Sequence, residues 1–193
     1  IIMASALGVV SVVTTLAPKE IYVSSTIGND TNSGTQTAPY KTISKALSVS
    51  TTGDILYVEG SYGTINITKS VKLIGINYPK VTGGIRCYKI DNVTISGFEV
   101  TGSKTTAGIL IDQCNNTIVE GNIVHDNIGA SVSGIVLRCN FCKATNNDVF
   151  NNQYVGIRIG GTSTTVEVSN NRVHDHTLST VDSDCIDIVS SSV

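Results

Sequence analysis

The chain has 193 residues, a formal net charge of −2 and only 15% charged residues, which excludes the basic surface typical of a nucleic-acid-binding domain. Its hydrophobic fraction is 40%, yet aromatic residues make up 5% and tryptophan is absent, while glycine occurs 18 times. Such a composition suits a single domain lined by small aliphatic side chains and interrupted by frequent turns.

Residues 1–19 begin with the uncharged stretch IIMASALGVVSVVTTLA. This stretch is shorter than the roughly 20 apolar residues that cross a bilayer, so we predict no membrane span. It resembles the apolar core and small-residue end of a secretory signal whose basic start is missing, which predicts an extracellular protein. The alternative is that residues 9–15, rich in β-branched side chains, form a strand that covers one end of the domain.

Residues 20–63 have the pattern of an N-terminal cap. A short strand at 21–23 leads into a loop rich in Gly, Asn and Thr, and residues 55–58 form the next strand. Thr42 is the expected N-cap of a brief helix that buries one face, made of Ile43, Ala46 and Leu47. We expect this segment to cover the open end of a stack of strands.

Residues 64–193 repeat one pattern, in which Gly84, Gly108, Gly134 and Gly156 each precede isoleucine at steps of 24, 26 and 22 residues. A period of this length indicates a solenoid. Positions i and i+2 of a strand face the same side. Three sets of aliphatic residues recur in this way: Ile85, Ile109, Ile135, Ile157 and Ile186; Cys87, Ile111, Leu137, Ile159 and Ile188; and Leu73, Ile95, Val119, Ala144 and Val168.

The predicted fold is therefore an all-β, right-handed parallel β-helix with a short N-terminal capping helix. No capping pattern follows the last repeat, so we expect the C-terminal end to be uncapped. An uncapped coil exposes a strand edge, which makes head-to-tail self-association a candidate property.

Asparagine recurs in one slot of the repeat. Asn122, Asn147 and Asn171 are 25 and 24 residues apart, and Phe98 occupies the same slot one coil earlier. Stacked amides can hydrogen-bond along the pile, so this spacing predicts an asparagine ladder. The alternative is that these residues only mark turns.

Five cysteines cannot all pair within the chain. Cys114 and Cys139 fall in one column on adjacent coils, where they are either disulfide-bonded or free thiols in the core. Cys139 and Cys142 form a C-x-x-C pair without further ligands at zinc spacing, so we interpret them as core residues, and Cys87 likewise.

The motif YVS…GND…NSGT…APYKTI…AL…GDILYV…GSY, within residues 20–75, resembles the N-terminal cap of secreted right-handed β-helix proteins. These include the pectate lyases of polysaccharide lyase family nine. The resemblance implies a polysaccharide partner, Ca²⁺ held by aspartates, and a lysine or arginine that removes the C5 proton of a uronate. A cap motif indicates the fold more strongly than the activity.

The coils differ most in the segment that follows the inward valine after the asparagine slot. Variable segments of a solenoid collect along one edge, which is often the binding face. We predict a site there in which the catalytic candidates are Arg158, Lys104, His125 and His174, and the substrate-binding candidates are Asp126, Asp175 and His176. The alternative is that these polar residues are solvated turn residues.

Residues 181–187, VDSDCID, supply the candidate metal ligands Asp182, Asp184 and Asp187, an oxygen-rich set suited to Ca²⁺. The run also resembles the NTDGID stretch of β-helical polygalacturonases, but the other motifs of those hydrolases are absent. Calcium-assisted β-elimination is therefore the favoured chemistry, because a bound cation acidifies the C5 proton.

Two functions remain open. The first is an extracellular β-helix protein that binds or cleaves acidic polysaccharide. The second is a non-catalytic structural or adhesive protein, including the subunit of a head-to-tail fibre.

Overall fold

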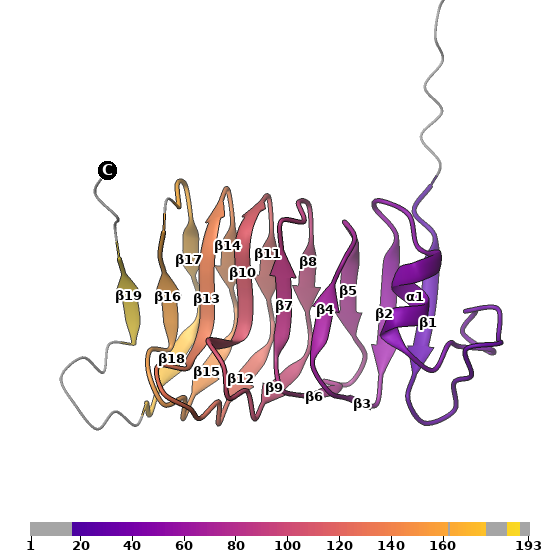
Figure 1. The fold of residues 1–193 in the computed structure, drawn as a ribbon, viewed down its shortest axis with the longest axis horizontal. Coiled ribbons are helices and arrows are strands. Elements are labelled where there is room, and N and C mark those ends of the chain that lie inside the picture. Colours follow the sequence, from indigo (N-terminus) through magenta and orange to yellow (C-terminus); the bar gives the residue numbers. More distant parts are fainter. Residues whose placement is uncertain (1–16, 162, 177–184, 190–193) are drawn as a thin grey trace, which may run out of the picture.

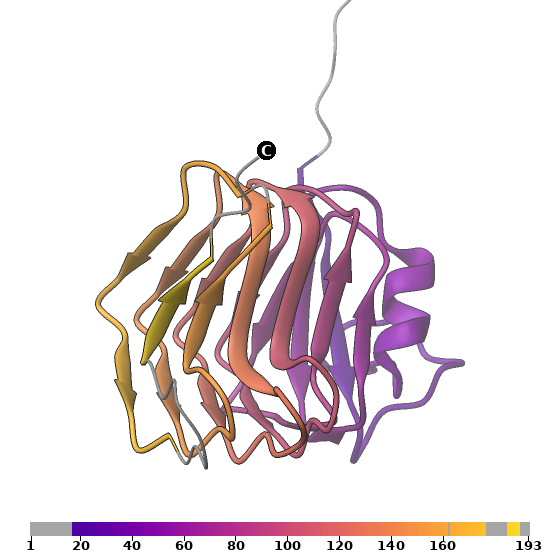
Figure 2. The same ribbon diagram turned by 60° about the vertical axis from the view of Figure 1, so that its left-hand side comes forward.

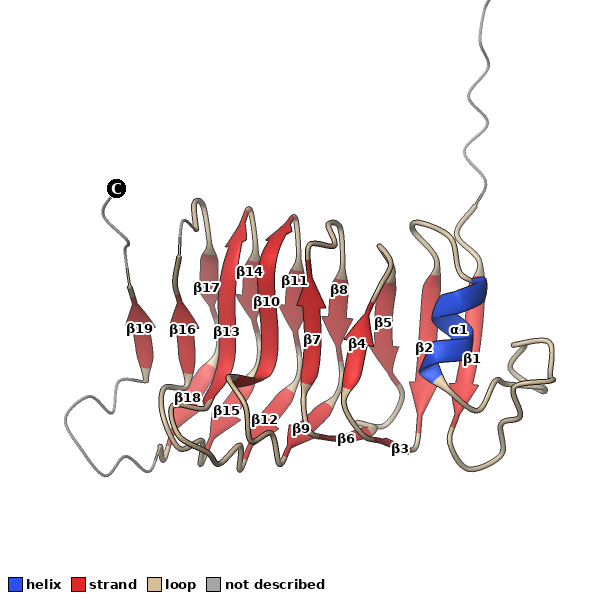
Figure 3. Ribbon diagram, viewed as in Figure 1, coloured by secondary structure: helices blue, strands red, loops and turns tan. Residues whose placement is uncertain are grey.

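The computed structural model describes residues 17–161, 163–176 and 185–189. Three parallel sheets wind into a right-handed parallel β-helix with one short helix in the described part (Figures 1 and 3). The predicted fold is confirmed. The prediction for residues 9–15 lies outside the described residues.

The first described elements are β1 (Glu20–Ser24), α1 (Ile43–Val49) and β2 (Ile55–Glu59). The Thr42 hydroxyl accepts the backbone N–H of Lys45 at 3.1 Å, so Thr42 is the N-cap that the sequence predicts. The helix buries Ile43, Ala46 and Leu47 and lies beside β1 at one end of the stack (Figure 1). No helix in the described ranges is long and apolar enough to cross a membrane.

From β2 onward each coil contributes one strand to each sheet, and the coils lie side by side in the oblique view (Figure 2). The seven-stranded sheet has the order β1-β2-β5-β8-β11-β14-β17. Its remaining strands are β5 (Lys72–Gly75), β8 (Thr94–Ser96), β11 (Ile118–Glu120), β14 (Lys143–Thr145) and β17 (Glu167–Ser169).

The second sheet, which we call the histidine sheet, has the order β18-β15-β12-β9-β6-β3. Its strands are β3 (Ser61–Tyr62), β6 (Lys80–Thr82), β9 (Glu99–Thr101), β12 (Ile123–His125), β15 (Asp148–Phe150) and β18 (Arg172–His174).

The third sheet, which we call the groove sheet, has the order β19-β16-β13-β10-β7-β4. Its strands are β4 (Ile65–Ile67), β7 (Ile85–Tyr88), β10 (Ala107–Asn115), β13 (Ser133–Asn140), β16 (Ile157–Ile159) and β19 (Ile186–Ile188).

The three predicted aliphatic columns stack in register in the interior, but the two on the groove sheet end at Ile186 and Ile188, which are exposed on the last described strand. On the groove sheet, Ile85, Ile109, Ile135 and Ile157 are successive register partners and are fully buried. The file that contains Ile95 stacks in the same way on the seven-stranded sheet. Because like residues stack on like, a repeat in the sequence becomes a uniform apolar core.

The predicted asparagine ladder is also confirmed. Asn122 Nδ2 donates to Asn147 Oδ1 at 3.0 Å, and Asn147 Nδ2 donates to Asn171 Oδ1 at 2.9 Å. Asn122 Oδ1 accepts the backbone N–H of Phe98 at 3.0 Å. Hydrogen bonds along the pile offset the cost of burying these amides.

A second ladder, which the sequence analysis missed, joins the histidine sheet to the groove sheet. Asn127 Nδ2 donates to Asn152 Oδ1 at 2.8 Å, and both side chains are fully buried. Asn127 Oδ1 accepts the backbone N–H of Ser103 at 2.9 Å. The repeat in the sequence did not reveal this ladder because its end positions are Ser103 and His176 instead of asparagines.

The cysteines follow the predicted columns. Cys139 and Cys142 are buried core residues, as interpreted, and they are also disulfide-bonded to each other, a pairing that the sequence analysis did not predict. Cys114 and Cys139 are register partners on β10 and β13, but no disulfide joins them, and Cys114 is a free thiol in the core. Phe141 lies between Cys139 and Cys142 with φ of 55°, and this left-handed residue reverses the chain so that the two thiols meet. Cys87 is a buried free thiol, as predicted.

Candidate functional site

The histidine sheet carries a column of aromatic rings on its outer face. The rings of His125 and Phe150 stack with centroids 4.9 Å apart and an interplanar angle of 4°, and those of Phe150 and His174 with 5.3 Å and 17°. The three residues are register partners on β12, β15 and β18. Stacked ring faces cover one another, so this column does not offer a sugar a broad aromatic surface.

Each ring nitrogen of His125 lies within hydrogen-bonding distance of a carboxylate. Nδ1 lies 2.7 Å from Asp126 Oδ2, and Nε2 lies 3.3 Å from Glu99 Oε1. Lys80 donates to the same Glu99 oxygen at 2.6 Å. The predicted residues His125 and Asp126 are thus brought together in a hydrogen-bonded chain that ends in the ion pair between Glu99 and Lys80.

His174 repeats this arrangement two coils further along. Nδ1 lies 2.6 Å from Asp175 Oδ2, and Nε2 lies 3.1 Å from Asp148 Oδ1. Arg172 pairs with the same Asp148 at 3.6 Å. Each imidazole is therefore held by two carboxylates, an arrangement that fixes the rings and occupies the nitrogens that general acid–base catalysis would use.

His176 differs from the other two histidines because it lies at the end of the second asparagine ladder. Its Nδ1 accepts the backbone N–H of Asn152 at 3.3 Å, while its Nε2 is buried with no hydrogen-bond partner in the described structure. Burial lowers the pKa of His176, which favours the neutral ring. The predicted substrate-binding residue is thus a ladder residue.

Arg158 and Asp187 meet on the outer face of the groove sheet, where β16 and β19 pair. Arg158 Nε lies 3.1 Å from Asp187 Oδ2, and its guanidinium carbon lies 5.5 Å from the centre of the Tyr154 ring. This predicted base is thus an ion-pair partner of a predicted metal ligand. Lys104, the other predicted base, is exposed on the segment between β9 and β10.

The other predicted metal ligands, Asp182 and Asp184, lie outside the described residues. Within the described ranges, no three histidine, cysteine, aspartate or glutamate side chains gather in a way that could hold a metal ion. The calcium site stays a prediction for which Asp187 is the one described residue.

The groove sheet carries a hollow of about 510 Å³ that the sequence analysis did not foresee. It lies where β10 and β13, with nine and eight residues, run past their shorter neighbours β7 and β16 (Figure 1). We call this hollow the groove. Its lining residues are Asp112, Gln113, Cys114, Asn115, Arg138, Cys139, Asn140 and Gly161.

Three side chains of different chemistry line up beside the groove. Tyr88, Asp112 and Arg138 are register partners on β7, β10 and β13. The Tyr88 residue is 54% exposed, and the Arg138 guanidinium lies 3.8 Å from Asp112 Oδ2, too far for a close ion pair. An aromatic ring, a carboxylate and a guanidinium are therefore presented at the spacing of successive coils, about 4.8 Å.

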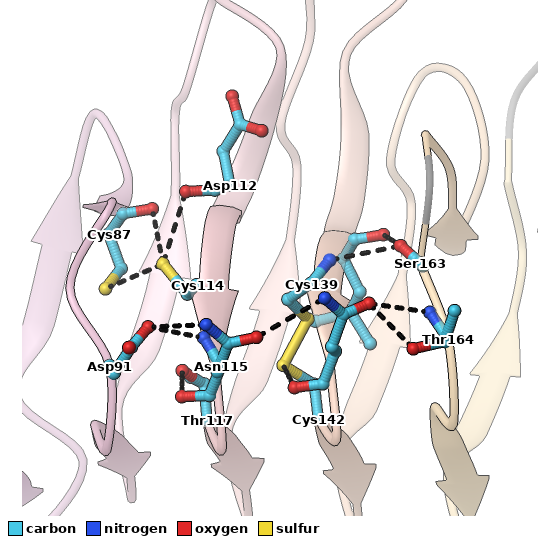
Figure 4. The surroundings of a disulfide bond; sticks show 12 residues. Cys87, Asp91, Asp112, Cys114, Asn115, Thr117, Cys139, Cys142, Ser163 and Thr164 are labelled. Atoms are coloured by element: carbon cyan, nitrogen blue, oxygen red, sulfur yellow. Dashed lines mark hydrogen bonds between the residues drawn. A yellow bond between two sulfur atoms is a disulfide. The ribbon is translucent and has the colours of Figure 1, made fainter.

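A file of polar side chains forms one edge of the groove (Figure 4). Asn115 Nδ2 donates to Asp91 Oδ1 at 3.1 Å, and Asn140 Nδ2 donates to Asn115 Oδ1 at 3.3 Å. Asn140 Oδ1 accepts the Thr164 hydroxyl at 2.9 Å. Hydrogen bonds between coils hold these amides in place, so the edge is fixed before any ligand arrives.

The groove residues had a signal in the sequence. Tyr88, Asp112 and Arg138 each follow an inward residue of the second aliphatic column by one position, so they form an outward column of the same repeat. The predicted site was drawn mainly from the variable loop segments and therefore did not include this column.

The model of the family described as right-handed β-helix region matches residues 27–173. Among solved structures, pectate lyase Pel9A is similar over 82% of this chain and 56% of its own, with a TM-score of 0.58 and 15% identity. A rhamnogalacturonan lyase aligns over 90% of this chain and 63% of its own, with a TM-score of 0.46 and 16% identity.

No curated protein matches the sequence. The chain spans less than two thirds of either lyase. The likeness to pectate lyase Pel9A, at 15% identity, establishes a shared fold and nothing about activity. The family match covers most of the chain, and the structure has the coils that the match implies. The chain therefore belongs to the right-handed β-helix family.

Proposed function

We propose that the protein binds an acidic polysaccharide along the outer face of the groove sheet. The observation that carries the proposal is the row of Tyr88, Asp112 and Arg138 beside the 510 Å³ groove. Successive coils are separated by about 4.8 Å, close to the length that one pyranose ring contributes to an extended chain. A glycan lying across the coils would therefore meet one member of the row with each sugar.

Each member of the row has a suitable role. The Arg138 guanidinium, which lacks a close partner at 3.8 Å from Asp112, binds the carboxylate of a uronate through two parallel hydrogen bonds. Asp112 and the amide file accept and donate hydrogen bonds to sugar hydroxyls. The exposed Tyr88 ring packs against the apolar face of a neighbouring sugar.

Calorimetric titration with polygalacturonate oligomers tests this proposal. Arg138→Ala should weaken binding about tenfold, the equivalent of roughly 1.4 kcal/mol, whereas Arg138→Lys should recover part of the loss. The matched control is Arg172→Ala, which removes an exposed arginine from the histidine sheet and should leave the affinity unchanged. Equal binding of a neutral galactan, or an equal loss in both alanine variants, would contradict the proposal.

The finer proposal is that the bound polysaccharide is cleaved by calcium-assisted β-elimination. It is supported by the acidic run at 181–187 and by the fold shared with a pectate lyase. Asp182, Asp184 and Asp187 would hold the Ca²⁺, which supplies acidity at C5 of the uronate. Arg158 or Lys104 would take the proton, whereas carboxylates already hold both ring nitrogens of His125 and His174.

Absorbance of the unsaturated product separates cleavage from binding. Wild-type protein with polygalacturonate or alginate should give a rising trace with Ca²⁺ and a flat one with a chelator. Asp187→Asn should reduce the rate more than it reduces the affinity. A flat trace with every substrate would remove the lyase proposal while leaving the binding proposal in place.

The proposed location is extracellular. The Cys139–Cys142 disulfide supports it, because structural disulfides are typical of secreted proteins. The alternative role, a non-catalytic adhesive or head-to-tail fibre subunit, predicts polymers in negative-stain micrographs and early elution from a sizing column. Monomers at all concentrations would exclude the fibre.

A further inference from the structure

Two free thiols lie against each other beneath the groove. The sulfur atoms of Cys87 and Cys114 are 3.5 Å apart, and each residue is 1% exposed (Figure 4). Cys87 belongs to β7 and Cys114 to β10, so the contact joins successive coils. A sulfur–sulfur approach between two strands held in register differs from an isolated buried thiol, because it places two oxidisable groups together.

A bulge in β10 creates the contact. Cys87 is the register partner of Ile111, and the register then shifts between Asp112 and Cys114. Gln113, the residue in the bulge, has a left-handed φ of 54°. The extra residue turns Cys114 back toward the interior, where its sulfur reaches that of Cys87.

The next coil already contains an oxidised pair. Cys139 is the register partner of Cys114 and forms a disulfide with Cys142. The four sulfur atoms therefore lie on three consecutive coils, and conditions that preserve one disulfide also favour oxidation of an adjacent pair of thiols.

We propose that Cys87 and Cys114 are a second disulfide site, which cross-links β7 and β10 under the groove. Two S–H bonds break and one S–S bond forms. The two electrons and two protons pass to a low-molecular-weight disulfide such as oxidised glutathione, which is reduced to two thiols. The reaction proceeds while the coils are open during folding, because the closed coils bury both sulfur atoms.

The two thiols differ in the folded protein, where the contact between their sulfur atoms lowers the pKa of Cys114, while the same contact together with burial raises the pKa of Cys87. In the open coils this contact is absent, so either thiol can attack the oxidant, which forms a mixed disulfide and releases one small thiol. The other cysteine then attacks the sulfur of the first and releases the second small thiol.

The cross-link would also make the floor of the groove more rigid. Cys114 lines the groove, and its thiol donates to the Asp112 carbonyl oxygen at 3.2 Å. A bond from Cys114 to β7 replaces this weak contact with a covalent one and fixes the bulge. The site is independent of what the groove binds.

Redox equilibration of the full chain tests the site. Native protein, and reduced unfolded protein allowed to refold, are held in glutathione buffers that span reducing to oxidising ratios. Free thiols are then trapped with N-ethylmaleimide in denaturant, and peptides are mapped by mass spectrometry without reduction. The expected result from the refolding arm is a peptide pair linked through Cys87 and Cys114, besides the one that contains Cys139 and Cys142.

Two variants keep the result interpretable. Cys185→Ser removes the exposed thiol and should leave the linked pair unchanged. Cys87→Ser should leave Cys114 fully trapped and lower the denaturant midpoint relative to the oxidised wild type. The proposal would be overturned if N-ethylmaleimide labelled both Cys87 and Cys114 at every glutathione ratio that oxidises Cys139 and Cys142. A disulfide from either residue to Cys139 would also overturn it.

Discussion

The outer faces of the histidine sheet and the groove sheet carry similar groups in different arrangements. On the histidine sheet, opposite charges stack closely between coils, as Lys80 does on Glu99 at 2.6 Å. On the groove sheet, Arg158 and Asp187 also pair closely at 3.1 Å, but beside the groove Asp112 and Arg138 share a register position and stay 3.8 Å apart. A face whose charges are satisfied internally contributes to stability, whereas incompletely paired groups retain hydrogen-bonding capacity for a ligand.

The largest expected effect is a loss of stability on changing the histidine sheet, and it distinguishes that sheet from the groove sheet. Phe150→Ala removes the ring that stacks on both His125 and His174, and we expect a loss of about 2 kcal/mol in the free energy of unfolding. Urea denaturation followed by circular dichroism measures it. Affinity for polygalacturonate should remain that of the wild type, because the column lies on another sheet.

Tyr88→Ala is the matched aromatic change on the groove sheet. The ring is 54% exposed, so we expect stability to change by no more than about 0.5 kcal/mol while glycan affinity falls. If Phe150→Ala weakens binding and Tyr88→Ala does not, the assignment of the two faces is reversed.

A smaller effect is expected for the carboxylates. Asp148→Asn removes the charge that pairs with His174 and Arg172, and we expect a loss of about 0.5–1 kcal/mol at low salt. Asp112→Asn, its counterpart on the groove sheet, should cost less because its one ion pair spans 3.8 Å. Parallel urea titrations at low and high salt measure the loss of stability in both variants. Equal losses would show that Asp112 is as strongly paired as Asp148.

The sequence predicts the interior of this molecule far better than its outer faces. The file from Ile85 to Ile157 was predictable because a buried position tolerates few side chains and the coil repeats it. The contact between Cys87 and Cys114 was not predictable by counting, since it depends on a one-residue bulge at Gln113.

The candidate site shows the same limit. The sequence analysis selected His125 and His174 as candidates, and both lie in one register column of the histidine sheet. The carboxylates that hold their second ring nitrogens, Glu99 and Asp148, come from the coil before. The groove depends on the lengths of β10 and β13 relative to their neighbours. Strand length is decided by packing between coils, which a single repeat does not encode.

The smallest expected effect concerns acid, and it sharpens the description of the histidine sheet as internally paired. The hydrogen bond from Lys80 lowers the pKa of Glu99 below its ordinary value of 4.5, and His125 lowers it further. A carboxyl whose pKa is lower in the folded state stabilises the fold above its unfolded pKa. This contribution disappears as the pH falls through the folded value.

Glu99→Gln should therefore cost about 0.5 kcal/mol at pH 7, since solvent screens the partly exposed pair with Lys80, and almost nothing near pH 3. Urea titrations of both proteins at the two pH values give the difference. In a Lys80→Met background the cost at pH 7 should shrink, because the largest cause of the shift has been removed. A cost that is the same at both pH values would mean that Glu99 acts through packing, and the charged ladder would then contribute no net stability.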